Sequence, residues 1–251
     1  MSIIIHSQYK SQENDIRQLV NNFYEDGEWI VKGSRNSIKS NYLQNEKVNI
    51  KFFQKPGLFK SIIYSFFRAT KAKRSFDYAN YLIKNDIKTP FPVAYVEEKN
   101  SLGLLGNSYY ISHQIEYDFT IRELIHDSLF KNRKIVLEQF AAFTFKMHEA
   151  KINFLDHSPG NTLILKRDET NYDFYLIDLN RMKFENLSIE KRMDNFKKMW
   201  LSKTMVKIIA NKYADLSNYN KQELLQILLL KTRQFKYKTY RKKFLKKKIG
   251  L

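Results

Sequence analysis

The chain of 251 residues contains no cysteine, which excludes disulfide bonds, a thiolate nucleophile and a cysteine-ligated zinc site. Nothing in it indicates an oxidising compartment, so a cytoplasmic protein is the default expectation. Its amino terminus, MSIIIHSQYK, has no basic segment before its three-residue apolar run, unlike a signal peptide. No apolar run approaches the roughly 20 residues that a membrane-spanning helix needs. We therefore expect neither export by a signal peptide nor insertion across a bilayer.

Acidic residues are scarce relative to basic ones: 26 Asp and Glu stand against 44 Lys and Arg, a formal net charge of +18. Such an excess predicts an anionic partner, which could be nucleic acid, a phospholipid surface or a phosphorylated substrate. The last 21 residues alone carry ten Lys or Arg and no acid. This segment is either a solvated basic tail or a binding surface. Its interleaved aromatic residues favour a surface for a membrane interface or a nucleic acid.

Glycine and proline are also few, at seven and four residues. Between Pro159 and Gly250 the one such residue is Gly160, and from about Leu187 the pattern is helical to the end of the chain. We find no internal repeat and no low-complexity linker. With 43% hydrophobic and 15% aromatic residues, the chain can bury the core of one large domain or of two joined lobes.

The amino-terminal half has the pattern of a sheet with one helix. Val48, Ile50 and Phe52 alternate with polar neighbours, which places Lys51 inside a strand. Residues 71–84 carry apolar side chains at mostly helical spacing, and the prolines of 88–98 then favour extended structure. The run SYYISHQI, residues 108–115, is again rich in strand-forming residues. Strand, helix and strand thus follow in order.

The carboxyl-terminal half centres on NFLDHSPGNTLI, residues 153–164, which follows an amphipathic helix predicted over 133–150. Polar residues bracketed by apolar segments indicate a loop pinned between buried elements, where catalytic groups are often held. Two short strands, TLIL and FYLIDL, come next around a charged turn. The order predicts an α+β protein with a β-rich amino lobe over 1–114 and a mainly helical carboxyl lobe over 115–251.

This arrangement resembles the two-lobe protein-kinase fold. Phosphoryl transfer needs a carboxylate base, ligands for Mg²⁺ and a cation on the nucleotide phosphates. Asp156 and Asn161 have the spacing of the base and the metal-binding asparagine of the kinase catalytic loop. Asp178 in YLIDLNR stands where kinases have a metal-binding aspartate, and Lys51 in VNIKFF is similar to the kinase phosphate-binding lysine. The resemblance implies ATP and Mg²⁺, with Asp156 as the base and Asn161 and Asp178 as metal ligands.

Several positions depart from the kinase pattern. Phe154 replaces the histidine that braces the catalytic loop, so this role is unfilled or is taken by His148 or His157. His148 is otherwise a packing residue at a helix end. Asn180 replaces a glycine, which we expect to be tolerated because asparagine adopts left-handed backbone angles more readily than most residues. Both metal ligands and the base remain, which argues for an active enzyme.

The nucleotide-binding positions depart further. The loop that covers the phosphates, VKGSRNSIK, has the single glycine Gly33, and we expect Ser34, with Asn36 and Ser37, to supply donors in place of more glycines. The helix carboxylate that orients the phosphate-binding lysine would be Asp77, which is one methylene shorter than the usual glutamate.

The loop FLDHSPGNTLI is closer to the H-x-D-x-x-P-x-N form of bacterial small-molecule and sugar kinases. With KAKRSFDYANYLIKNDIKTPFPVAYVE and LIDLNRMKF, it resembles the lipopolysaccharide core kinase family over roughly residues 30–200. Membership would imply transfer of the ATP γ-phosphate to a sugar hydroxyl, on Kdo or heptose, of the lipopolysaccharide inner core. The enzyme would then act as a peripheral protein at the inner face of the cytoplasmic membrane.

Residues 51–74 form a second basic and aromatic stretch, which suits either an interfacial segment on anionic lipid or a helix packed into the core. Two other functions remain open. A soluble kinase of a small molecule such as an aminoglycoside is disfavoured by the charge of +18, because a cationic substrate calls for an acidic pocket. The other is a degenerate kinase fold that binds nucleic acid through its basic tail. We expect a nucleic-acid partner less than a lipid partner. The zinc-protease, serine-hydrolase and Walker patterns are incomplete or missing.

Overall fold

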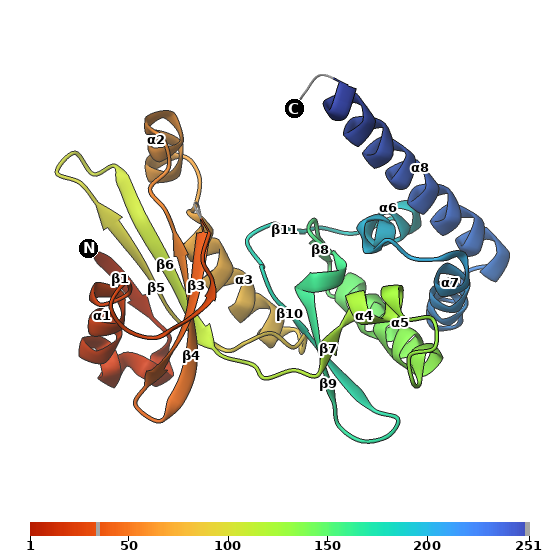
Figure 1. Cartoon of the computed structure of the whole chain (residues 1–251), viewed down its shortest axis with the longest axis horizontal. Coiled ribbons are helices and arrows are strands. Elements are labelled where there is room, and N and C mark those ends of the chain that lie inside the picture. The colour runs from red at the N-terminus through yellow and green to blue at the C-terminus, as the bar shows by residue number, and fades with distance from the viewer. Residues whose placement is uncertain (34–35, 249–251) are drawn as a thin grey trace. The chain divides into compact units, whose positions relative to one another are not determined.

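The computed structural model describes residues 1–33 and 36–248 of the chain (Figure 1). It divides into two compact units, Met1–Glu116 and Tyr117–Leu251. The lobe boundary expected after residue 114 lies two residues before this division.

The first unit contains a six-stranded antiparallel sheet in the order β1-β5-β6-β4-β3-β2. Lys51 lies inside β4, opposite Ile38 of β3 and Tyr110 of β6, while the side chains of Val48, Ile50 and Phe52 are buried. The strand predicted around Lys51 is therefore present. The strands are β1 (Ser2–Ile5), β2 (Glu28–Val31), β3 (Asn36–Leu43), β4 (Glu46–Phe53), β5 (Pro92–Lys99) and β6 (Leu105–His113).

The expectation of a single helix in this unit was wrong. The helix predicted over 71–84 is α3 (Lys71–Lys84), but α1 (Glu13–Asn21) and α2 (Leu58–Phe66) also form, and a short 3₁₀ helix η1 (Ser7–Gln12) precedes α1. Ile16 and Val20, spaced four residues apart, bury one face of α1 in the core of the sheet. The surrounding segment is rich in Asn, Gln and Glu, so the helical spacing of its few apolar residues was not recognised in the sequence.

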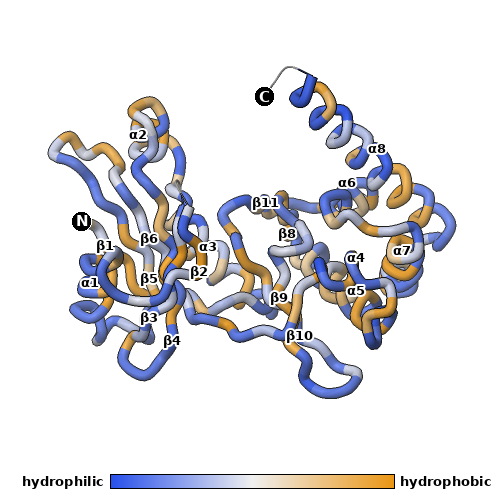
Figure 2. The backbone as a smooth tube through the Cα atoms, viewed as in Figure 1, coloured by the Kyte–Doolittle hydropathy of each residue, from blue (hydrophilic) through white to orange (hydrophobic). Residues whose placement is uncertain are grey.

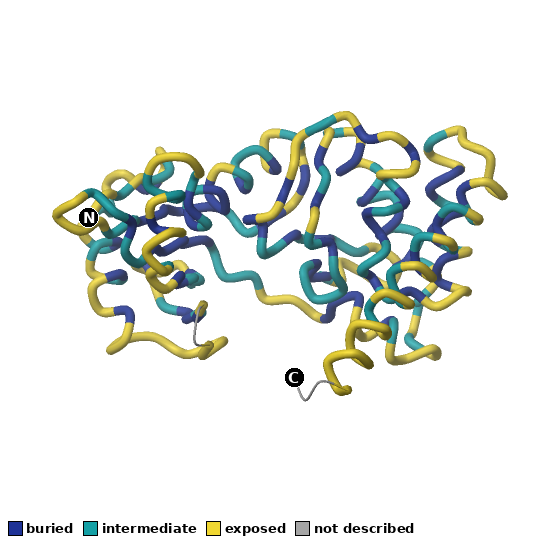
Figure 3. Tube along the Cα trace, turned by 90° about the horizontal axis from the view of Figure 1, so that it is seen from above, coloured by how far each residue is buried: buried dark blue, intermediate teal, exposed yellow. Residues whose placement is uncertain are grey.

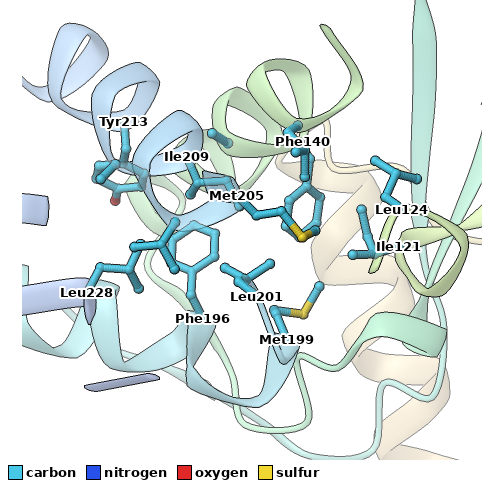
Figure 4. Packing of buried hydrophobic residues seen from close by; sticks show 14 of the residues in the cluster. Ile121, Leu124, Phe140, Phe196, Met199, Leu201, Met205, Ile209, Tyr213 and Leu228 are labelled. Atoms are coloured by element: carbon cyan, nitrogen blue, oxygen red, sulfur yellow. The ribbon is translucent and has the colours of Figure 1, made fainter. Parts of the chain in front are cut away.

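The second unit is mainly helical. Its helix α5 covers Arg133–Glu149, ending one residue before the predicted end. The two short strands predicted around the charged turn are β9 and β10, which pair as an antiparallel hairpin. Buried residues of α5, α7 and α8, among them Phe140, Tyr213 and Leu228, share one core with Phe196 (Figure 4). The elements are β7 (Phe119–Thr120), α4 (Ile121–His126), α5, β8 (Ile152–Phe154), η2 (Pro159–Asn161), β9 (Thr162–Lys166), β10 (Tyr172–Leu176), β11 (Met182–Phe184), α6 (Ile189–Asn195), η3 (Phe196–Met199), α7 (Lys203–Ser217) and α8 (Lys221–Lys248).

The long helix α8 has two different halves. Leu224, Leu228 and Thr232 are buried in its first half, whereas the rest of the helix is largely exposed (Figure 3). The rings of Phe235 and Tyr240 still contact Trp200, with centroids 5.8 Å apart in both pairs. The basic tail predicted from the sequence is thus a helix whose last turns lie in solvent. Among the helices of the described residues, none is long and apolar enough to cross a membrane.

Together the two units confirm the predicted α+β class, with a β-rich amino unit and a mainly helical carboxyl unit.

Candidate active site

The β9–β10 hairpin brings the two predicted metal ligands to one end of a short ladder. Thr162 pairs with Leu176, so Asn161 and Ile177 continue side by side, and the Ile177 N–H donates to the Asn161 carbonyl at 3.0 Å. Asp178 is the next residue. The seventeen positions that separate Asn161 from Asp178 in the chain are therefore closed by an antiparallel hairpin.

A second ladder brings Asp156 to the same segment. Phe154 of β8 pairs with Met182 of β11, and the Leu155 N–H donates to the Arg181 carbonyl at 3.0 Å. The Arg181 guanidinium lies 3.4 Å from the Asp156 carboxylate. The base predicted at Asp156 therefore lies beside the stretch that directly follows Asp178.

Asp156 is held by two cations. The Lys198 ammonium donates to Asp156 Oδ1 at 2.8 Å and to the Leu155 carbonyl at 2.6 Å, while Arg181 approaches the other carboxylate oxygen. Partial burial alone would raise the pKa of Asp156, but the hydrogen bond and charge of Lys198, followed by the charge of Arg181, lower it overall. The carboxylate is therefore ionised at neutral pH.

Sequence reasoning missed Lys198. It lies on η3, 42 residues after Asp156, and the kinase resemblance gave no reason to single it out among the many lysines of the chain. No local pattern could have found it, because its contact with Asp156 exists only once η3 has packed against the loop.

Asp178 adopts a left-handed backbone conformation with φ of 58°. Such angles are uncommon outside glycine and cost of the order of 1 kcal/mol or more, so they persist where the surroundings enforce them. The Asn180 side chain, which is buried, donates to Asp178 Oδ1 at 2.8 Å. We expected Asn180 to take the left-handed angles. Asp178 is among the described residues with positive φ, and Asn180 is not. The Asn180 side chain instead orients the Asp178 carboxylate.

Asn161 and Asp178 fit a magnesium site by their chemistry. The Asn161 amide nitrogen donates to the Asp156 carbonyl at 2.9 Å, which leaves its side-chain oxygen as the acceptor to offer a metal. Mg²⁺ is usually held by one or two protein oxygens together with substrate phosphates and water, rather than by a complete protein cage. In keeping with this, the described residues contain no cluster of three or more His, Cys, Asp or Glu side chains arranged for a metal.

Asn195 braces the loop that carries Asp156 and Asn161. Its amide nitrogen donates to the Phe154 carbonyl at 2.9 Å and to the Asn153 side chain at 3.0 Å. Its oxygen therefore accepts, from His157 Nδ1 at 3.0 Å and from His148 Nε2 at 3.3 Å. Neither histidine contacts the Phe154 carbonyl directly in this network. Asn195 makes that contact, and His148 and His157 both donate to Asn195.

Neither of these histidines can serve as an acid or base near neutral pH. Burial lowers the pKa of His148 to about 3 and that of His157 to about 4, and the hydrogen bonds to Asn195 offset only part of this effect. Both rings are neutral and structural. Phe154, at the position of the kinase histidine, is itself fully buried.

Gly160 leaves room for an arginine beside the loop. A Cβ atom there would lie 2.5 Å from the Arg122 guanidinium, which comes from α4. The loop that carries Asp156 and Asn161 is thus lined by three cations: Arg122, Arg181 and Lys198.

The predicted nucleotide-binding residues lie in the first unit. Lys51 lies 5.7 Å from the centroid of the Phe53 ring. Asp77 forms an ion pair with Lys73, one turn earlier in α3, at 3.0 Å. The pairing of Asp77 with Lys51 therefore stays a prediction.

Gly33 lies close to the first residues of β3. The Ser37 hydroxyl donates to the Gly33 carbonyl at 2.9 Å, and a Cβ atom on Gly33 would lie 2.5 Å from the Asn36 carbonyl. Only glycine fits there without a backbone shift. Ser34, the other residue predicted in this loop, lies outside the described residues.

Comparisons with known proteins identify a family and a similar fold. Residues 35–227, more than half of the chain, match the model of the family described as "Lipopolysaccharide kinase (Kdo/WaaP) family". Among solved structures, the chain is similar to one titled "WaaP in complex with acyl carrier protein", with a TM-score of 0.67 and 13% identity over 94% of this chain and 99% of that chain. At this identity the likeness concerns the fold alone. A comparison with curated proteins finds no match.

Proposed function

Because the chain belongs to the lipopolysaccharide kinase (Kdo/WaaP) family, we propose that it transfers the γ-phosphate of ATP to a sugar hydroxyl, on Kdo or heptose, of the lipopolysaccharide inner core. Family membership makes it a kinase, and hence a phosphotransferase. The sugar acceptor, ATP and Mg²⁺ are the parts that we propose. The observation that carries the proposal is the convergence of Asp156, Asn161 and Asp178 through two short ladders of one unit.

In this reaction Asp156 orients the acceptor hydroxyl and takes its proton. A carboxylate with a lowered pKa is a weak base, which suits phosphoryl transfer because its transition state is loose and depends mainly on positioning and charge stabilisation. Lys198 and Arg181 hold the carboxylate in place, and their charges would offset negative charge that develops beside Asp156 in the transition state.

Asp178 and Asn161 would hold Mg²⁺, which when bound neutralises charge on the nucleotide phosphates. The amide of Asn180 and the hairpin bond from Ile177 to Asn161 keep both ligands in position before any nucleotide arrives. In the first unit, Lys51 would pair with the phosphates, and Gly33, which has no side chain, would let the backbone approach them closely. Asp77 is the carboxylate of α3 that would orient Lys51. To do so, it would leave its ion pair with Lys73 and form one with Lys51.

We further propose that the enzyme works as a peripheral protein on the inner face of the cytoplasmic membrane, where its lipid-linked acceptor lies. The formal charge of +18 and the exposed basic end of α8 support attraction to an anionic surface. The same charge disfavours a cationic small-molecule acceptor of the aminoglycoside type.

The experiment that tests the proposal is incubation of the protein with ATP, Mg²⁺ and purified inner-core glycolipid, followed by mass spectrometry of the glycan. We expect one sugar to gain about 80 daltons, the mass of a phosphoryl group, and no gain with the Asp178→Asn variant. Phosphorylation of an aminoglycoside but not of the glycolipid would overturn the acceptor. Tight, strongly salt-dependent binding of nucleic acid with no binding of Mg-ATP would overturn the enzymatic proposal itself.

A further inference from the structure

Helix α2 packs against its own unit with polar residues and exposes apolar ones. Ser61 is its one buried residue, and the Ser61 hydroxyl donates to the Leu105 carbonyl of β6 at 2.7 Å. Ser65 accepts a hydrogen bond from the Leu105 N–H at 2.8 Å. Large apolar side chains face solvent instead, with exposed fractions of 77% for Phe59 and 82% for Phe67. Ordinary surface helices do the reverse, so the outer face of α2 has the composition of a contact surface.

The apolar face of α2 includes Leu58, Phe59, Ile62, Phe66 and the following Phe67, all of which are exposed. Hydrophobic residues are correspondingly frequent along the α2 tube (Figure 2). We call this set the α2 apolar face.

The charge around this helix has one sign. No acidic residue occurs from Phe52 to Phe76, whereas this stretch contains six basic residues: Lys55, Lys60, Arg68, Lys71, Lys73 and Arg74. Burial first, and then the nearby charge of Arg68, lowers the pKa of Arg74, which shows that some of these cations are close together. Lys73 is paired with Asp77, whereas like charges among the other basic residues repel one another, and a bound anion reduces this repulsion.

The beginning of α2 adds to this positive field. Its first turn has no acidic residue and no side-chain cap, and Lys60 lies within it. The amino end of a helix carries partial positive charge, so a lysine there is unfavourable unless an anion is bound.

Beside the α2 apolar face is a pocket of about 340 Å³. It is lined by Lys55, Lys60 and Lys71, together with Phe53 and Tyr64, and none of the described residues that line it is acidic. Lys71 is positioned by Asn36, whose side-chain oxygen lies 3.3 Å from its ammonium, and its ammonium lies 5.4 Å from the centroid of the Phe53 ring. We call this the lysine pocket.

We propose that the α2 apolar face enters the surface of a lipid bilayer and that the lysine pocket binds the phosphate of an anionic lipid in that bilayer. The inference deepens the proposed function, on which it rests for the choice of a membrane, by naming the part of the chain that makes contact. A soluble phosphate compound would satisfy the lysines and leave the apolar face exposed. A bilayer satisfies both, since phosphate groups and acyl chains lie next to each other at its interface.

The test is flotation of the full chain with vesicles of phosphatidylcholine alone or with added phosphatidylglycerol or phosphatidic acid. We expect binding only to the anionic vesicles. The variant Phe59→Ser with Phe67→Ser and the variant Lys55→Gln with Lys60→Gln should each bind on the order of tenfold more weakly. The matched control, Lys10→Gln with Lys84→Gln, removes two exposed lysines of the same unit outside the pocket and should change binding less than about threefold.

A second measurement reports the site of insertion. Phe59→Trp places a fluorophore on the α2 apolar face, and Tyr42→Trp places one on β3, where Tyr42 is also exposed. We expect brominated lipid in anionic vesicles to quench the added emission of Phe59→Trp and to leave that of Tyr42→Trp unchanged. Lys10 lies in the last turn of η1 and Lys84 in the last turn of α3, where a positive charge is favourable. Circular dichroism would verify that each variant is folded.

Equal vesicle binding by the α2 variants and the control would overturn the proposal, and so would quenching at Tyr42→Trp in place of Phe59→Trp. Displacement of bound vesicles by millimolar glycerol 3-phosphate would also overturn it, because the pocket would then favour a soluble phosphate compound over a lipid. The assay contains no ATP and no sugar acceptor, and Asp178→Asn should bind vesicles as the unmodified chain does. Failure of this inference is therefore distinguishable from failure of the kinase proposal.

Discussion

The Lys198 ammonium lies 2.8 Å from the carboxylate of Asp156 and 2.6 Å from the carbonyl of the residue before it. One lysine thus holds both the side chain and the backbone of the loop that carries the proposed base. Because Asp156 is partly buried, its charge would be costly without such a partner. Lys198 is therefore a positioning residue for Asp156 as well as a source of positive charge at the site.

Replacing Lys198 with methionine should move the pH dependence of activity. The lysine provides the largest effect that lowers the pKa of Asp156; after its removal partial burial still raises that pKa, and Arg181 alone is left to lower it. We expect kcat/KM to fall on the order of 10- to 100-fold and its acidic limb to move to higher pH. Lys197→Met is the matched control, since Lys197 pairs with Asp194 and not with Asp156. An unchanged acidic limb in Lys198→Met would contradict the assigned role.

Two aspartate variants should fail in different ways. Asp156→Asn removes the base but keeps the metal ligands, so kcat should fall by roughly 10²- to 10⁴-fold while Mg-ATP still binds. Asp178→Asn removes a metal ligand, so both turnover and the magnesium dependence of nucleotide binding should be lost. Titration calorimetry with ATP, with and without Mg²⁺, separates the two variants. Near-normal activity in either one would refute its role.

Asn195→Ala should destabilise the carboxyl-terminal unit. The change removes the donor to the Phe154 carbonyl and the acceptor for two buried histidines, and each buried group left unpaired costs about 1–3 kcal/mol. We expect the free energy of unfolding to fall by about 2–4 kcal/mol in urea denaturation. A matched exposed variant, Asn186→Ala, should change it far less, because Asn186 lies at the surface outside this network. Equal stability of the two variants would show that the network contributes little.

Acid should destabilise the fold through His148 and His157. Their folded-state pKa values of about 3 and about 4 lie below the ordinary value of 6.5, so the unfolded chain binds protons first as the pH falls. Their contribution is complete well above pH 6.5 and is lost as the pH falls from 6.5 to about 4 for His157 and to about 3 for His148. Each histidine adds a slope of up to about 1.4 kcal/mol per pH unit to the free energy of unfolding.

The variant His157→Asn keeps an N–H donor for Asn195 but does not titrate, so about half of this slope should disappear in urea denaturation between pH 4.5 and 6.5. His126→Asn, a change at an exposed position, should leave the slope as it is. A full slope in His157→Asn would mean that other groups cause the acid sensitivity.

Local patterns allowed much of the chain to be read correctly. The alternation around Lys51 predicted β4, the spacing of apolar residues predicted α3 with its bounds, and the apolar segments on both sides of the catalytic loop predicted where Asp156 and Asn161 lie. Each of these signals is carried by residues a few positions apart, because strands and helices repeat every two or 3.6 residues. The helix α1 was missed since its few apolar residues are diluted by polar ones. For the stretch that contains α2, an interfacial segment and a helix packed into the core both stayed open in the sequence, and the structure shows a helix whose apolar residues face outward.

The amino-acid sequence by itself determined the fold class, the order of the elements, the charge and the residue types that phosphoryl transfer needs. Only the tertiary structure decided that Lys198 holds Asp156, that Asn195 joins two histidines behind the loop, and that Asp178 takes the left-handed angles while Asn180 orients it. The physical reason is that these contacts join elements far apart in the chain. These hydrogen bonds and ion pairs become strong when water is excluded around them, and an unpaired charge or polar group becomes costly there. Water is excluded only when the elements pack together.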